Sequence, residues 1–178
     1  MKYFEKIRQF VAEILMKKQI SKQGRKKSTS NFDLSKNIGV VFNSTKNENL
    51  ISSKKFIDSL VDMNIEVTGL ALYESKKIPD HLVQDEKCIF FNNQDFNFFY
   101  QAKTNEIKSF IKKDFDILID LCIEDNFLIN CVVELSASKF KVGKYDKKKN
   151  YDFMINIKDG DLDFYIEQII LYVSSLKV

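Results

Sequence analysis

The stretch FDILIDLC at residues 115–122 decides the fold, because it is an apolar run interrupted only by Asp116 and Asp120. A short run of this kind is typical of a strand that is buried on both faces of a parallel sheet. A second run, NIGVVFN at 37–43, has the same character and is rich in β-branched residues. We therefore predict a parallel sheet in which the 115–122 strand lies near the centre.

Segments of strand and helix character alternate on both sides of this stretch. Further strands are predicted at 65–73, 87–91, 139–143 and 152–157. Helices are predicted after Asn49 and over 104–113, 126–137 and 161–177, with Asn49, Thr104 and Asp161 as N-caps. Strands that alternate with helices imply crossover connections. The expected fold is α/β: a three-layer, doubly wound, mostly parallel sheet of five or six strands, Rossmann-like or flavodoxin-like.

Residues 1–31 differ in pattern from residues 32–178, which we assign to the α/β domain. From residue 2 to about 18 the apolar side chains follow the spacing of one helix face, at Tyr3, Phe4, Ile7, Phe10, Val11, Ile14 and Leu15. KKQISKQGRKK (17–27) then holds six basic residues and no acid. We predict an amphipathic helix followed by a flexible or partly helical basic linker.

The net charge of +3 conceals an asymmetry along the chain. Residues 1–36 contain ten basic and three acidic residues, a net charge of +7, whereas the other 142 residues have a net charge of −4. A second basic concentration, KFKVGKYDKKK at 139–149, lies within this acidic remainder and holds six lysines. Closely spaced positive charges repel one another unless a polyanion neutralises them, so both stretches indicate an anionic partner.

The expected compartment is the cytoplasm. The three cysteines, Cys88, Cys122 and Cys131, lie among apolar neighbours and read as buried free thiols of a reducing environment. No apolar run approaches the roughly 18 residues that span a bilayer. Charged residues interrupt any apolar core that a secretory signal would need near the amino terminus.

Polar residues that follow the predicted strands form a possible crevice: Asn43, Ser44, Thr45 and Asp120. The loop NSTKNEN after the 37–43 strand has no glycine, which argues against a cradle for nucleotide phosphates. We expect Ser44 and Thr45 to be turn residues and Asp120 to bond the next helix amino terminus. His81 and the scattered cysteines fit no catalytic or metal pattern, so we expect no cofactor, metal or catalytic residue.

An aromatic segment, DFNFFY at 95–100, has two interpretations. Exposed aromatic rings stack on single-stranded bases. Such residues more often form the loop's own small core against the sheet, and we favour that interpretation.

The sequence resembles two known families. FDILIDLCIEDNFLINCVVELSASKFKVGKYD (115–146) with YDFMINI (151–157) resembles an uncharacterised Bacteroidota family of small α/β domains with a basic amino-terminal helix, a likeness that covers roughly residues 1–176. The central segment is also similar to the amino-terminal half of heptosyltransferase-like glycosyltransferases, through Ile119, Asp120, Leu121 and Lys139 to Gly143. The second resemblance supports the fold, but this chain is too short for the second half that holds the sugar nucleotide.

The leading hypothesis is a non-catalytic RNA-binding protein associated with the ribosome. Its phosphate contacts would come from Lys17, Lys18, Lys22, Arg25, Lys26 and Lys27, with Lys139, Lys141, Lys144, Lys147, Lys148 and Lys149 as a second patch. A peripheral membrane or membrane-complex adaptor that uses the same amino-terminal segment is the first alternative. A protein partner on the apolar face of helix 2–18, and a small ligand in the crevice, remain open.

Overall fold

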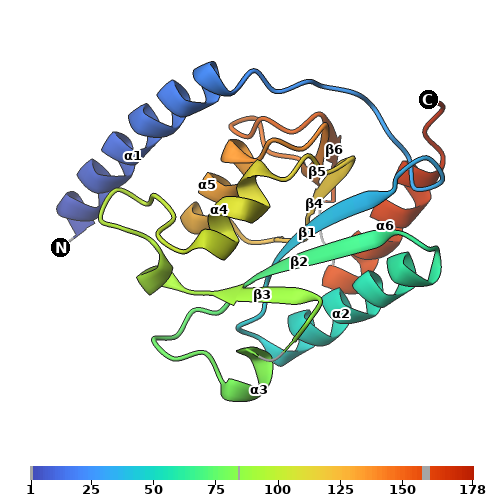
Figure 1. Ribbon diagram of the computed structural model, residues 1–178, viewed down its shortest axis with the longest axis horizontal. Helices are drawn as coiled ribbons and strands as arrows, with labels where there is room; N and C mark the ends of the chain where they lie inside the picture. Colours follow the sequence, from blue (N-terminus) through green and yellow to red (C-terminus); the bar gives the residue numbers. More distant parts are fainter. Residues whose placement is uncertain (1, 84, 158–160) are drawn as a thin grey trace.

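The computed structural model describes residues 2–83, 85–157 and 161–178 and contains a six-stranded sheet (Figure 1). Its strands are β1 (Asn37–Asn43), β2 (Glu66–Leu72), β3 (Cys88–Phe91), β4 (Ile117–Asp120), β5 (Phe140–Lys144) and β6 (Phe153–Ile155). They pair in the order β3-β2-β1-β4-β5-β6, and every pair is parallel. The chain therefore has the predicted Rossmann-like α/β fold, and its 115–122 strand is one of the two central strands.

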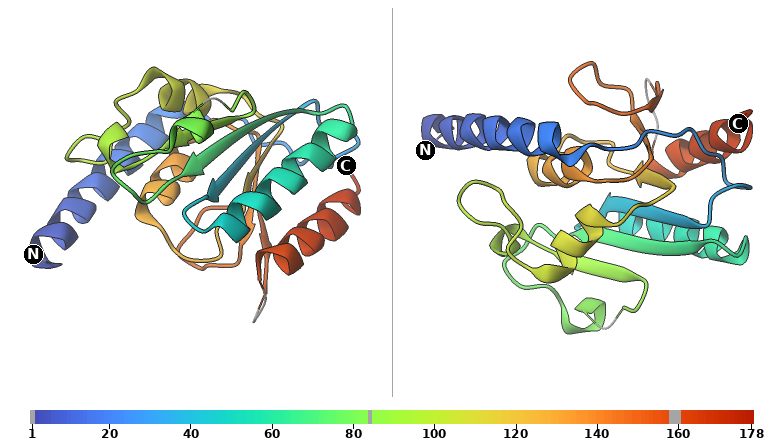
Figure 2. Two further views of the ribbon diagram at one scale, coloured as in Figure 1. Left: turned by 90° about the horizontal axis from the view of Figure 1, so that it is seen from below. Right: turned by 45° about the horizontal axis from the view of Figure 1, so that its top comes forward.

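Helices cover both faces of the sheet. They are α1 (Lys2–Gln23), α2 (Asn47–Asp62), α3 (Asp80–Val83), α4 (Asn105–Lys112), α5 (Phe127–Leu135) and α6 (Leu162–Ser174), with a short 3-10 helix at Asn93–Asp95. Helices α2 and α6 pack on one face, and α4 and α5 pack on the other (Figure 2). Three layers result, with one apolar core on each side of the sheet.

The two central strands are buried on both faces, and apolar residues fill all of their inner positions except Asp120 at the end of β4. In β1 the side chains of Ile38, Val40 and Phe42 point into the core under α2 and α6, and Val41 points into the opposite core. Phe115, just before β4, packs its ring against Phe110 of α4 at 4.9 Å between centroids. This two-sided burial is the property that made both strands recognisable in the sequence.

The connection from β5 to β6 spans only residues 145–152 and contains no helix. A third helix on that face is instead supplied by the amino terminus, since α1 packs against α5 and shares its core. Figures 1 and 2 show α1 along the outside of the body, with its amino-terminal half reaching beyond it. Helix α1 thus completes the helical layer on this face of the sheet, to which the connection between β5 and β6 contributes no helix.

Several predicted element ends were wrong. Helix α1 continues to Gln23 rather than ending near residue 18, because Gln19, Lys22 and Gln23 are good helix formers. Helix α2 begins at Asn47 after Lys46, so Asn49 is not its cap, and Thr104 occupies the cap position of α4 without a side-chain hydrogen bond. Helix α3 was not predicted. Asp161 caps α6 as expected, its side chain accepting from the Phe164 N–H.

The segment that follows α1 is held in place rather than flexible. Gly24, with φ at +59°, ends the helix, and Phe32 is buried. Between them, the Ser28 N–H donates to the Lys139 carbonyl, and the Asn31 side chain donates to the Leu176 carbonyl after α6. The linker predicted to be flexible or partly helical is therefore helical as far as Gln23, and from Gly24 it is an ordered strap across the edge of the sheet where the strands begin.

Candidate nucleic-acid interface

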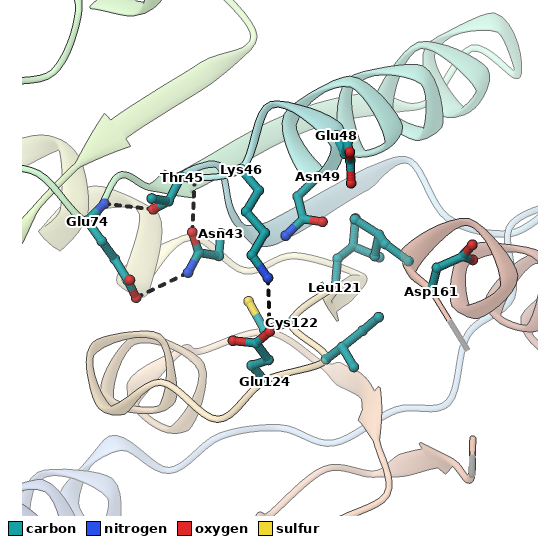
Figure 3. A pocket seen from close by; sticks show the side chains of 12 residues that line it. Asn43, Thr45, Lys46, Glu48, Asn49, Glu74, Leu121, Cys122, Glu124 and Asp161 are labelled. Atoms are coloured by element: carbon teal, nitrogen blue, oxygen red, sulfur yellow. Dashed lines mark hydrogen bonds and ion pairs between the residues drawn. The ribbon is translucent and has the colours of Figure 1, made fainter. Parts of the chain in front are cut away.

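The predicted crevice exists where the carboxyl ends of β1 and β4 diverge, which is the topological switch point of the sheet. It is a cavity of about 320 Å³, and its walls include the side chains that Figure 3 labels. Asn43 and Thr45 line it as predicted, whereas Ser44 is buried and donates to the Leu72 carbonyl. Sequence reasoning thus found the position of the crevice.

Hydrogen bonds tie the mouth of this crevice together. The Asn43 side chain donates to Glu74 Oε1 at 3.2 Å, and the Asn126 side chain donates to the same oxygen at 2.7 Å. Thr45 Oγ1 accepts the Glu74 N–H at 2.8 Å (Figure 3). The polar groups after β1 are therefore engaged with β2 and with the start of α5.

The charge of the crevice is unsuited to phosphate. Its described lining residues carry four carboxyl side chains, from Glu48, Glu74, Glu124 and Asp161, and one ammonium group, from Lys46. Lys46 Nζ already pairs with Glu124 at 3.2 Å. Among the described lining residues, a phosphate placed here would meet net negative charge and no glycine.

Asp120 lies beneath the crevice in the core and does not contact the next helix amino terminus, so that prediction was wrong. Its side chain accepts from the Cys122 N–H at 2.8 Å and from the Tyr151 hydroxyl at 2.5 Å. Burial and the neighbouring Asp120 raise the pKa of Tyr151 well above its ordinary value. Asn126 caps α5 instead, because its side chain directly precedes the helix and reaches the Leu128 and Ile129 N–H groups.

The first basic stretch divides into exposed lysines and an anchor. Lys17, Lys18 and Lys22 are exposed on the last turns of α1, and Lys26 is exposed after it. Arg25 is the anchor. Its guanidinium pairs with Asp152 and donates to the Ser138 and Lys139 carbonyls, with Lys27 Nζ 3.0 Å from the same Asp152 carboxylate.

The second basic patch is mostly occupied by contacts within the protein. Lys139 pairs with Asp114 and Asp116, Lys144 donates to the Ile123 carbonyl, and Lys149 pairs with Asp125. Lys141 is buried, with 3% of its surface exposed, and donates to the Glu134 carbonyl. Lys147 and Lys148 alone of this patch are exposed, on the loop between β5 and β6. Together with Arg25 and Lys27 of the first stretch, the four lysines with internal contacts bring to six the number of the twelve predicted phosphate-contact residues that instead make contacts within the protein.

A different set of lysines lies opposite the end of α1. A cavity of about 770 Å³ separates α1 from α4 and from the loop before α4. We call it the lysine groove. Its lining residues are Gln19, Lys22, Gln23, Asn97, Gln101, Ala102, Lys103, Lys108, Ile111, Lys112 and Leu135.

Of the twelve residues predicted from sequence, Lys22 alone lines the lysine groove. Lys103, Lys108 and Lys112 were missed, since each is separated from the basic stretch by about eighty residues or more of chain. One local signal was present: Lys108 and Lys112 are four residues apart, which places them on one edge of the helix. Lys103 and Lys108 donate to the carbonyls of Gln94 and Lys103, contacts that leave their charges unneutralised.

The aromatic segment is divided between the core and the surface. Phe96 and Tyr100 are buried in the core under α5, whereas Phe98 and Phe99 are exposed. Cys88, Cys122 and Cys131 are all buried free thiols, as predicted. In the described ranges no group of three or more His, Cys, Asp or Glu side chains is arranged to hold a metal ion, and no helix has the length and apolar character to cross a membrane.

The fold and its charged surfaces define a small Rossmann-like α/β domain with an acidic crevice and a basic groove. Comparison with known families agrees with this size and extent. A family of unknown function, DUF6913, matches residues 8–176, and the chain belongs to it. No curated protein and no solved structure matches the chain.

Proposed function

We propose that the protein is a non-catalytic RNA-binding protein that holds RNA phosphates in the lysine groove, with ribosomal RNA as the target. One observation carries the proposal: the groove brings together four lysines and four carboxamide side chains, and none of its described lining residues is acidic. Ammonium groups bind phosphates as point charges, and side-chain amides donate to phosphate oxygens. The groove therefore offers the donor set that a sugar-phosphate backbone requires.

The distribution of charge over the rest of the molecule supports this choice of surface. The crevice at the switch point is acidic and would repel the same backbone. Lys17, Lys18 and Lys26 extend positive charge beyond the groove along the same end of α1. Contacts of this kind are made to the sugar-phosphate backbone of the RNA, so the binding is expected to be largely independent of base sequence.

The sequence resemblances enter this proposal only in part. The proposal includes a cytoplasmic location, because the three cysteines are free thiols and free thiols are typical of a reducing compartment. Occurrence in Bacteroidota and a likeness to glycosyltransferases remain expectations from the resemblance, and the proposed binding depends on neither.

Fluorescence anisotropy with a labelled ribosomal RNA fragment tests the proposal. With four to six lysines on phosphates, affinity should fall about 10²- to 10³-fold between about 50 and 200 mM salt. Lys22→Glu combined with Lys112→Glu should weaken RNA binding at least about tenfold. It should also reduce the number of counterions released on binding, measured from the salt dependence of the affinity, by about two. Neither lysine forms an ion pair with any described residue, so the fold should remain intact.

A matched control reverses two exposed lysines outside the groove, Lys76→Glu with Lys77→Glu, which changes the net charge by the same amount. Equal losses in the two variants, or no binding at low salt, would contradict the proposal. Co-sedimentation of the protein with ribosomes, abolished by nuclease treatment, is the outcome expected if ribosomal RNA is the target.

A further inference from the structure

The apolar face of α1 that the sequence displays is turned away from the domain. Phe4, Ile7, Phe10 and Ile14 follow one another at helical spacing, and their exposed fractions are 64%, 56%, 63% and 51%. Soluble domains expose single apolar side chains routinely, but a continuous row of this size indicates an interaction site.

Other side chains hold α1 against the body and fix this orientation. Ala12 is buried, and Met16 and Ile20 pack partly buried against the core under α5. Near the amino terminus, Glu5 accepts the Tyr100 hydroxyl, and the Arg8 guanidinium lies 4.0 Å from the centre of the Tyr100 ring. Rotating α1 about its axis until the apolar row faced the domain would break all of these contacts. The contacts therefore keep the row exposed.

Two aromatic side chains of the loop before α4 extend the row. The ring centroids of Phe4 and Phe98 are 5.8 Å apart, and those of Phe98 and Phe99 are 5.2 Å apart. Both loop residues are substantially exposed. We define the apolar stripe as Phe4, Ile7, Phe10, Ile14, Phe98 and Phe99.

Positive charge continues the stripe toward the carboxyl-terminal end of α1. Lys18 follows Ile14 by four residues on the same side of the helix, and Lys17 flanks it. Of the two acids in α1, Glu5 is held by Tyr100 and Arg8. Glu13, the other acid, is exposed and lies three residues after Phe10. The apolar stripe is therefore followed on α1 by two exposed lysines, Lys17 and Lys18.

We infer that the apolar stripe is a binding site for the surface of an anionic lipid bilayer. Phenylalanine and isoleucine side chains of an interfacial helix enter the boundary between headgroups and acyl chains, and neighbouring lysines contact anionic headgroups. A second copy of the chain is the alternative occupant, and the oligomeric state in solution distinguishes it from a bilayer.

Flotation of the full chain with vesicles tests the inference. Binding is expected to phosphatidylcholine vesicles that contain phosphatidylglycerol and to be much weaker without it. Ile7→Ser with Phe10→Ser should lower the vesicle partition coefficient at least about tenfold, since two apolar side chains no longer leave water. Lys17→Gln with Lys18→Gln should lower it by a similar factor, at roughly fivefold for each lysine.

The control removes two equally exposed apolar residues from α6, through Phe164→Ser with Leu171→Ser, and should leave flotation unchanged. Absence of flotation, equal loss in this control, or a dimer in sedimentation equilibrium that Ile7→Ser with Phe10→Ser dissociates would overturn the inference. Lys22→Glu with Lys112→Glu should retain flotation while losing RNA, and this difference separates the bilayer site from the lysine groove.

Discussion

Lys141 carries a buried ammonium group with one hydrogen-bond acceptor, the Glu134 carbonyl near the end of α5, at 2.9 Å. Burial lowers the pKa of Lys141 to about 8, and the neighbouring charge of Arg25 contributes in the same direction. The lysine therefore satisfies a helix-terminal carbonyl at the cost of removing a charge from water.

This arrangement predicts a rise of stability with pH. Below about pH 8 the lysine is charged in both states, and the folded protein bears the full burial cost. Between about pH 8 and 10.5 the folded protein has lost the proton that the unfolded chain still binds, so the free energy of unfolding rises by up to about 3 kcal/mol. Urea unfolding of the native chain and of Lys141→Met over this range measures the effect. Curves that stay parallel would contradict it.

Gly143 of β5 is required by the ring of Tyr151, which lies directly over it. A Cβ atom at this position would stand about 2.6 Å from Tyr151 Cε1 and Cε2, well inside van der Waals contact. The same ring directs its hydroxyl to the buried Asp120. One glycine thus allows the tyrosine to reach the carboxyl group beneath the crevice.

Gly143→Ala is expected to lower the free energy of unfolding by about 2 kcal/mol, because the ring must move away from its site. Tyr151→Phe keeps the ring and removes the hydroxyl, which should cost about 1–3 kcal/mol by depriving Asp120 of a buried partner. Denaturant unfolding distinguishes the two effects when the double variant is added, since displaced packing and a lost hydrogen bond at one ring are not additive. A Gly143→Ala variant as stable as the native chain would refute this account.

At the scale of the element, α1 ends where Gly24 adopts a left-handed backbone conformation, with φ at +59°. A Cβ atom at Gly24 would meet no other atom within 4 Å, so a substitution there strains the backbone alone. This turn directs the chain from the helix into Arg25 and its partner Asp152.

Gly24→Ala should therefore destabilise the protein by about 1 kcal/mol, and Gly24→Asn by less, because asparagine tolerates this conformation. Thermal unfolding followed by circular dichroism measures both. Equal melting temperatures for the alanine variant and the native chain would show that α1 can end in another way.

The elements differ in how far the sequence predicts them. Strands β1 and β4 were predictable because residues such as Val40 and Ile119 are buried whichever face they occupy. The docked face of α1 was not, because its apolar periodicity points to Phe10 and Ile14, whereas the smaller Ala12 packs against α5. An amphipathic pattern predicts that one face of a helix will be buried. It does not identify which side of the helix packs against the rest of the domain.

The whole molecule separates its charges between two cavities. Carboxyl groups gather in the crevice at the carboxyl ends of β1 and β4, and lysines gather in the groove between α1 and α4. The sequence located the crevice, because strand ends in a parallel sheet follow from topology. It could not locate the groove, since Lys22 and Lys112 meet only through the docking of α1.

The bond between Arg25 and Asp152 also has a consequence for folding. It joins residues that are 127 positions apart, and Asp152 lies just before the last strand. Helix α1 precedes β5 and β6 in the chain, and closing so long a loop has to be compensated by contacts that complete late, so we expect α1 to dock only after β5 and the start of β6 have formed. Until then the inner side of α1 and the outer side of α5 would both be uncovered, and we expect the nascent chain to be more prone to aggregation than the native protein.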